Sequence, residues 1–224
     1  MRGCRACLGR VVSLVPNRSR IRRTLTAVLR LLLVLAITSG VWQFLPVAAS
    51  SQTRTWDGGV VRYFDASGME GTVAMAAERW NRSGARVHLV PVADVRAAGL
   101  VIKADDHSLR RLCGADCLGY TTSIGRPASG QTTVLLAREL RGSPRPLSVW
   151  VAAHELGHVL GLQHRGGRKC SLMSPHAFDT RCSPSLAAEP PTQAQLACIP
   201  APRDVDAAVG MYGGRRAPDD PRCR

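Results

Sequence analysis

The chain has 224 residues, 45% hydrophobic and 21% charged, so it can bury a core and does not have the composition of a disordered protein. Its net charge of +14 would suit nucleic-acid binding if it were spread over a folded surface. However, residues 1–50 hold eight arginines and no acid, and the rest of the chain has 22 basic and 16 acidic residues. No basic cluster with interleaved aromatic residues follows residue 50, so we expect no nucleic-acid partner.

Residues 1–49 are typical of an export signal. The arginines precede a run of 19 uncharged residues, 31–49, which ends in a small-residue sequence resembling a cleavage site, Val47-Ala48-Ala49. We favour a signal peptide cleaved near Ala49. The alternative is an uncleaved membrane anchor, since a run of this length just spans a bilayer. In both cases the rest of the chain is expected outside the cytoplasm, either secreted or tethered to the extracytoplasmic face of the membrane by residues 31–49.

Residues 50–214 alternate strand and helix patterns and predict one domain. Ser67 and Glu70 have the spacing of a capping box, which would begin a helix over about 68–81. Two further helices are expected at about 147–160 and near 205–212, the last one capped by Gly213. The expected strands are 60–64, 86–92, 99–104, 118–124 and 132–137. This order predicts an α+β fold in which helices pack on a mixed sheet.

Six cysteines lie in the exported part, an even number that indicates disulfides in an oxidising compartment. The sequence does not choose among the many pairings that six cysteines allow. Pairing of neighbours would close the shortest loops, and with such pairing Cys223 would tie the tail, residues 215–224, to the domain. The neighbour pairs are Cys113 with Cys117, Cys170 with Cys182, and Cys198 with Cys223.

One predicted helix carries the residues for metal chemistry. His154 and His158 are four residues apart and project from the same side, opposite the apolar stripe, so they would face a cleft. Two imidazoles one turn apart suit two corners of a zinc tetrahedron. Gly161 would end the helix, because glycine tolerates the left-handed conformation of a sharp turn. That turn would bring His164 back as the third ligand of one catalytic Zn²⁺ ion.

Glu155 lies beside His154, where its carboxylate can reach a zinc-bound water without occupying the metal. Zinc held by three neutral imidazoles would lower the pKa of this water to about 7. Glu155 would then take the proton, and hydroxide would attack a peptide carbonyl, after which Glu155 would protonate the leaving amine. The pattern predicts an exported zinc-dependent endopeptidase acting on proteins or peptides. The alternative is an exported zinc-binding interaction module that no longer cleaves.

The motif His-Glu-x-x-His-x-x-Gly-x-x-His at 154–164, followed by Met173 in a Ser-Leu-Met-Ser-Pro sequence, resembles the metzincin clan of zinc peptidases. Within this clan the chain is most similar to the matrixins, through Ala-Ala-x-x-Trp-Asn at 76–81 and the final Tyr212-Gly213. The resemblance covers nearly all of residues 56–213. It implies a twisted mixed sheet above the cleft, a horizontal zinc helix, a Met-turn and a small subdomain after Gly161.

The resemblance also implies individual roles. Met173 would form an apolar floor beneath the zinc ligands, and the substrate would lie along the upper edge strand as an added β-strand. Ser174 departs from the family, because matrixins usually have tyrosine there. Separately, Asp105 and Asp106 could bind a structural Ca²⁺ ion or form a solvated acidic turn. We expect a monomer. The residues assigned to the substrate edge are Gly119, Tyr120 and Thr121.

Overall fold

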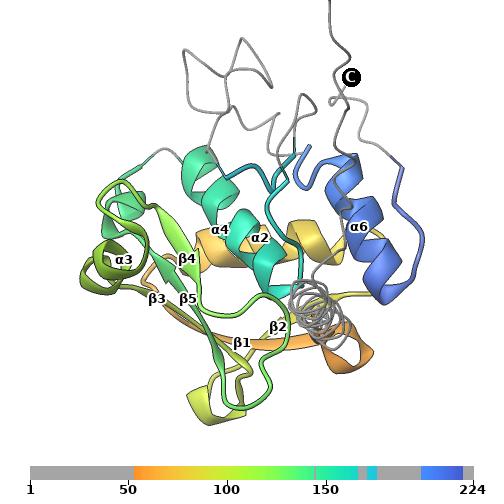
Figure 1. Cartoon of the computed structure of the whole chain (residues 1–224), viewed down its shortest axis with the longest axis horizontal. Coiled ribbons are helices and arrows are strands. Elements are labelled where there is room, and N and C mark those ends of the chain that lie inside the picture. Colours follow the sequence, from red (N-terminus) through yellow and green to blue (C-terminus); the bar gives the residue numbers. More distant parts are fainter. Residues whose placement is uncertain (1–52, 144, 166–170, 176–197, 219–224) are drawn as a thin grey trace, which may run out of the picture. The chain divides into compact units, whose positions relative to one another are not determined.

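The computed structural model describes residues 53–143, 145–165, 171–175 and 198–218 (Figure 1). The chain divides into two compact units, Met1–Ser51 and Gln52–Arg224. The predicted leader and its apolar run fall outside the described residues, all of which belong to the second unit. Within the described ranges, no helix is both long enough and apolar enough to cross a bilayer.

Five strands form one mixed sheet in the order β2-β1-β3-β5-β4. β1 pairs in parallel with β2 and β3, and β3 pairs in parallel with β5, whereas β4 runs antiparallel to β5 at one edge. Each strand overlaps its predicted range, and the structure has the expected α+β class. The strands are β1 (Val60–Ala66), β2 (His88–Pro91), β3 (Leu100–Ala104), β4 (Gly119–Thr121) and β5 (Thr132–Leu136).

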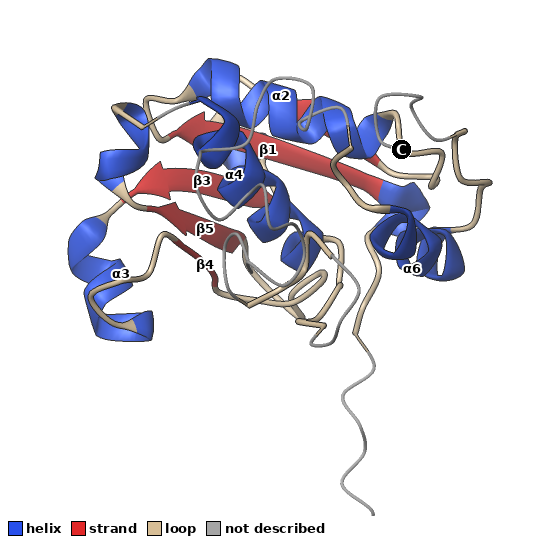
Figure 2. Ribbon diagram, turned by 90° about the horizontal axis from the view of Figure 1, so that it is seen from above, coloured by secondary structure: helices blue, strands red, loops and turns tan. Residues whose placement is uncertain are grey.

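Helices α2 (Glu70–Asn81) and α4 (Arg145–Val159) pack against each other and cover the same face of the sheet (Figures 1 and 2). Trp80 joins the two helices, because its indole Nε1 donates to the Ala153 carbonyl of α4 at 2.9 Å. The buried side chains of α2 recur at helical spacing, in agreement with the helix expected over this range. The buried ones are Val73, Ala76, Ala77 and Trp80.

The second half of α4 is buried on all sides, since every residue from Val151 to Val159 is buried. The carbonyls at the end of a helix have no partner within it. Here, side chains from both ends of the domain supply two partners. Trp56 Nε1 donates to the Val159 carbonyl at 2.7 Å, and the hydroxyl of Tyr212, the last residue of α6 (Pro202–Tyr212), donates to the Leu160 carbonyl at 2.9 Å. The helix that carries the motif is therefore fixed along its length and at its end.

The start of α2 differs from the prediction. The helix begins at Glu70 rather than at about residue 68, and no side chain caps it. Ser67 Oγ accepts a hydrogen bond from the amide of Met69 at 3.0 Å, so it forms a local turn instead. The capping-box prediction was wrong because the serine hydroxyl found a backbone donor nearer in the chain.

Helix α3 (Asp106–Cys113) was not predicted. Asp105 is its N-cap, with Oδ1 accepting from the Ser108 amide at 3.1 Å. Asp106 Oδ1 accepts from the Arg138 amide at 2.8 Å. Both carboxylates thus hold backbone amides, and nothing in the described residues supports the calcium site suggested for this pair.

Cys113 and Cys117 form the predicted neighbour disulfide between α3 and β4. Cys198 is also disulfide-bonded. The other two predicted pairings involve residues outside the described ranges. Beyond α6, the amide of Arg215 donates to the Gly84 carbonyl at 3.0 Å and that of Ala217 to the Ser83 carbonyl at 2.8 Å. The first residues of the predicted tail therefore pair with the turn after α2.

Candidate metal centre

Three histidines from α4 and the turn after it converge on one point. The Nε2 atom of His164 lies 3.2 Å from that of His154 and 3.0 Å from that of His158. One ring nitrogen from each of the three histidines lies within 4.8 Å of the other two. In a tetrahedral site with Zn–N bonds of about 2.0–2.1 Å, two ligand nitrogens are about 3.3 Å apart. The predicted ligands are thus brought together at spacings that a metal ion could bridge.

Backbone carbonyls hold the other ring nitrogen of both helical histidines. His154 Nδ1 lies 2.6 Å from the Leu172 carbonyl, and His158 Nδ1 lies 2.7 Å from the Leu162 carbonyl. A carbonyl only accepts, so Nδ1 carries the proton and Nε2 keeps its lone pair for a metal. Burial lowers the pKa of His154 to about 4, and it lowers the pKa of His158 as well. Both rings are therefore neutral at neutral pH, as metal ligands must be.

Two glycines, Gly157 and Gly161, allow the close packing around the second half of α4 and the turn that follows it. Gly161 ends the helix with φ +99°, and a Cβ there would lie 2.5 Å from Met211 Cε. The turn predicted at Gly161 is present, and its positive φ would strain any residue with a side chain. A Cβ on Gly157 would collide with Met173 Sδ. Met173 is fully buried, so it packs directly against α4 at the residue preceding His158.

The turn that carries Met173 is anchored by Asp204 of α6. The fully buried Asp204 carboxylate accepts from Ser171 Oγ and, at 2.7 Å, from the Leu172 amide. Burial raises the pKa of Asp204, although these hydrogen bonds oppose the shift. Because the Leu172 carbonyl holds His154, Asp204 supports a candidate ligand from a distance. We did not single it out in the sequence, where the only signal is an acid beside the apolar stripe of the last helix.

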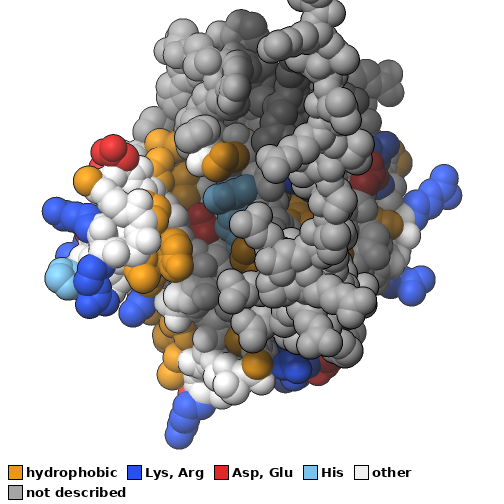
Figure 3. All heavy atoms as spheres, in the orientation of Figure 1, with side chains coloured by type: hydrophobic (Ala, Val, Ile, Leu, Met, Phe, Trp, Pro, Cys, Tyr) orange, Lys and Arg blue, Asp and Glu red, His pale blue; other side chains and the backbone are white. Residues whose placement is uncertain are grey.

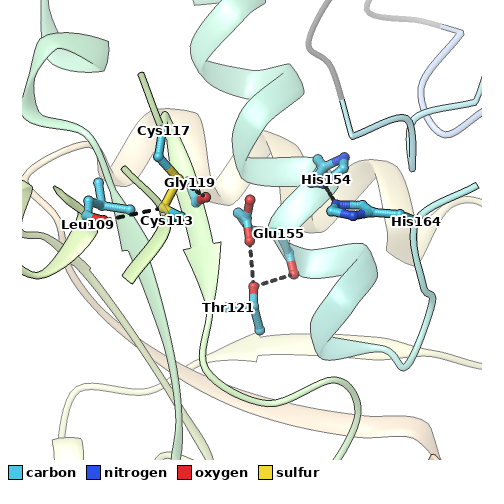
Figure 4. Close-up of a disulfide and its surroundings, with 8 residues drawn as sticks. All are labelled: Leu109, Cys113, Cys117, Gly119, Thr121, His154, Glu155 and His164. Carbon is cyan, nitrogen blue, oxygen red and sulfur yellow. Dashed lines mark hydrogen bonds between the residues drawn. A yellow bond between two sulfur atoms is a disulfide. The ribbon is translucent and has the colours of Figure 1, made fainter. Parts of the chain in front are cut away.

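Glu155 is only 4% exposed and faces β4 across the site (Figure 4). Its Oε2 accepts from the hydroxyl of Thr121 at 2.7 Å. Burial raises the pKa of Glu155 to about 7, and the Thr121 hydrogen bond offsets part of this rise. A carboxyl that titrates near neutrality can both take up and return a proton at physiological pH.

The three residues assigned to the substrate edge make up all of β4, and this strand is the last one on its side of the sheet. One side of β4 pairs with β5, where Tyr120 lies opposite Leu135. On its other side, β4 pairs with no strand of the described part of the chain.

A cleft of about 940 Å³ is lined by residues of both β4 and α4, and its lining includes the three histidines, Glu155 and the Cys113–Cys117 loop. Figure 3 shows histidine and acidic side chains in a hollow with hydrophobic side chains beside it. The Trp150 ring also lines the cleft and stacks on His154, with ring centroids 5.3 Å apart and planes at 23°. We did not predict a role for Trp150, although it lies one helical turn before His154.

No family model and no curated protein matches this chain. The solved structures that match include that of myroilysin, with 16% sequence identity and a TM-score of 0.36 over 49% of this chain and 52% of that one. The chain thus spans about half the length of that structure. So slight a likeness carries no argument about function, which has to be inferred from the site itself.

Proposed function

We propose that the chain is an exported zinc-dependent endopeptidase of the metzincin clan. Within this clan we propose that it is matrixin-like, because its sequence motifs resemble the matrixins most. The observation that carries this proposal is the convergence of three histidine Nε2 atoms at a cleft, beside a buried glutamate from the same helix. The ligands are His154, His158 and His164, and the catalytic residue is Glu155. Their motif is the one that zinc peptidases of this clan use.

The residues present fit a zinc ion. Three neutral imidazoles are a typical ligand set of catalytic zinc, which keeps its fourth position for water or substrate. The Nδ1–H groups of His154 and His158 each donate to a backbone carbonyl, and this hydrogen bond orients the ring as is usual for histidines that bind a metal. Imidazole also suits copper, iron and nickel, so the identity of the metal belongs to the test.

When bound, zinc supplies Lewis-acid catalysis, which polarises a carbonyl and makes water a better nucleophile at neutral pH. Glu155 acts as the general base that accepts a proton from the attacking water. It then acts as the general acid that donates this proton to the leaving amine. The edge of β4 that pairs with no strand of the described residues binds the substrate backbone as an added strand.

The proposal is tested by incubating the full-length protein, refolded under oxidising conditions and loaded with zinc, with a peptide library. We expect one zinc ion per chain and cleavage that a chelator abolishes and added zinc restores. Zinc binding without any cleavage would favour the alternative, an inactive interaction module. Failure to bind zinc would contradict both the peptidase and the zinc-binding interaction module.

Export is the part of the proposal that rests on residues 1–49. We expect the protein outside the cytoplasm with its N-terminus near residue 50, and mass spectrometry of the natural N-terminus measures this. An intact leader in the membrane fraction would instead indicate a tether through residues 31–49. Protein that stays in the cytoplasm would contradict export.

A further inference from the structure

Strand β4 contacts the proposed catalytic carboxylate through Thr121, although Thr121 and Glu155 are 34 residues apart in the chain. Thr121 Oγ1 lies 2.7 Å from Glu155 Oε2 and 3.2 Å from the Glu155 carbonyl oxygen. A hydroxyl has one proton to donate, and the shorter contact leads to the more strongly accepting carboxylate. Figure 4 shows Thr121 below the Glu155 side chain, with both contacts drawn.

Gly119 provides the space that this carboxylate occupies. A Cβ on Gly119 would lie 2.6 Å from Glu155 Oε1 and 2.9 Å from Glu155 Cδ, closer than real side-chain contacts allow. Residues two apart in a strand point to the same face, so Gly119 and Thr121 face Glu155 together. The carboxylate therefore fits into a notch on β4, which we define as the space beside Gly119 with the Thr121 hydroxyl at its end.

The notch supplies the hydrogen bond that orients the buried Glu155 carboxylate. Among the described residues, Thr121 makes the one hydrogen bond to the Glu155 carboxylate. Glutamate has three side-chain torsions, and fixing such a side chain in one rotamer costs free energy. A general base must also lie within hydrogen-bond reach of the proton that it abstracts. The Thr121 hydroxyl thus has the position needed to orient the base.

We infer, on the basis of the proposed function, that Thr121 is a positioning residue for Glu155 and that Gly119 is needed to leave room for it. The same short strand then has two roles. Its backbone edge is available for substrate, while its side chains hold the base. Because the Thr121 hydroxyl contacts the base, its loss is expected to lower kcat and to leave KM nearly unchanged.

The first test compares Thr121→Val, which removes the hydroxyl at nearly constant shape, with Thr121→Ser, which keeps it. Hydrogen bonds to charged groups contribute about 1.5–3 kcal/mol, so Thr121→Val should lower kcat by roughly 10- to 100-fold. We expect KM within about threefold of wild type, an unchanged zinc content, and kcat within about threefold for Thr121→Ser. Thr133→Val makes the same change on neighbouring β5 and should have little effect on kcat.

The second test does not depend on activity. Urea unfolding of the metal-free full-length protein is measured for Thr121→Val, Glu155→Ala and the double variant. If the two side chains interact, their effects on the unfolding equilibrium constant should deviate from additivity by about fivefold or more. Additive effects would show that the hydroxyl does not hold the carboxylate.

The outcomes separate this inference from the proposed function. A wild-type protein that cleaves no peptide would refute the function, and the unfolding cycle would still decide whether Thr121 holds Glu155. If the wild type cleaves and Thr121→Val has normal kcat, the positioning role is wrong and the function stands. Equal losses in Thr121→Val and Thr121→Ser would also overturn it, since the retained hydroxyl would then have no effect.

Discussion

The two walls of the cleft, α4 and β4, differ in what holds them. The site half of α4 is buried throughout, and its histidines are fixed by carbonyls of Leu162 and Leu172, which follow in the same stretch of chain. β4 is a partly exposed strand of three residues that meets Glu155 through the Thr121 hydroxyl and the space beside Gly119. We therefore expect changes in the α4 wall to affect metal binding and changes in the β4 wall to affect turnover.

The largest effect is expected from removing a ligand in the α4 wall. His158→Ala leaves two imidazole ligands. Mutating a residue that only supports a metal ligand typically lowers metal affinity by roughly 10- to 100-fold, so loss of a ligand itself should lower zinc affinity by more. Cleavage should fall with it. Zinc content after dialysis measures this, with the exposed His88→Ala as the matched control. Zinc retained at one ion per chain would contradict the ligand assignment.

Glu155→Ala separates chemistry from metal binding within the same wall. The variant should keep its zinc and lose at least roughly 100-fold in kcat, the usual scale of general acid–base catalysis. Glu139→Ala removes an exposed carboxylate and should cleave normally. A near-normal rate in the Glu155 variant would exclude Glu155 as the base.

Asp204→Ala tests whether Asp204, which lies outside the cleft, helps to hold His154 in place through Leu172. Two donors lose a buried acceptor, so the free energy of unfolding should fall by about 2–4 kcal/mol. Zinc affinity should fall too, because the Leu172 carbonyl that holds His154 is displaced. Asp206→Ala, on the exposed side of α6, should change stability by no more than about 0.5 kcal/mol. Equal stabilities of the two variants in urea unfolding would exclude the anchoring role.

The smallest effect concerns the charge of Glu155 in the metal-free protein. Burial raises the pKa of Glu155 from its ordinary value of 4.5 to about 7, so between pH 4.5 and pH 7 the folded state still holds a proton that the unfolded chain has released. The resulting stability is present below pH 4.5 and is lost as the pH rises through 7. Glu155→Gln cannot ionise and should exceed wild type by about 1–3 kcal/mol at pH 8. Near pH 4 the two should unfold alike, and a difference independent of pH would contradict the shift.

The same two walls show how far the sequence could predict the site. The α4 wall depends on spacings of three and four residues and on one glycine turn, so the positions of His154, His158, Gly161 and His164 follow from local geometry. The edge position of β4 was expected only from the resemblance. The contact between β4 and Glu155 could not be predicted from the sequence. It joins Thr121 to a residue far along the chain, and the position of Thr121 depends on the order of the strands in the sheet.

Local errors in the fold have a related cause. Ser67 and Asp105 both have the chemistry of a helix cap, but only Asp105 caps one. Short polar side chains bond whichever backbone amide lies nearest, and the surrounding packing decides which amide that is. The long apolar stripes at α2, α4 and α6 were predicted because burial of a whole helix face outweighs such local competition.

The most direct test of the central claim is a crystal structure of the zinc-loaded full-length protein with anomalous diffraction recorded at the zinc absorption edge. We expect a single strong peak about 2.0–2.1 Å from the Nε2 atoms of His154, His158 and His164. No peak between these rings, or rings that point away from one another around a zinc ion bound elsewhere, would contradict the account.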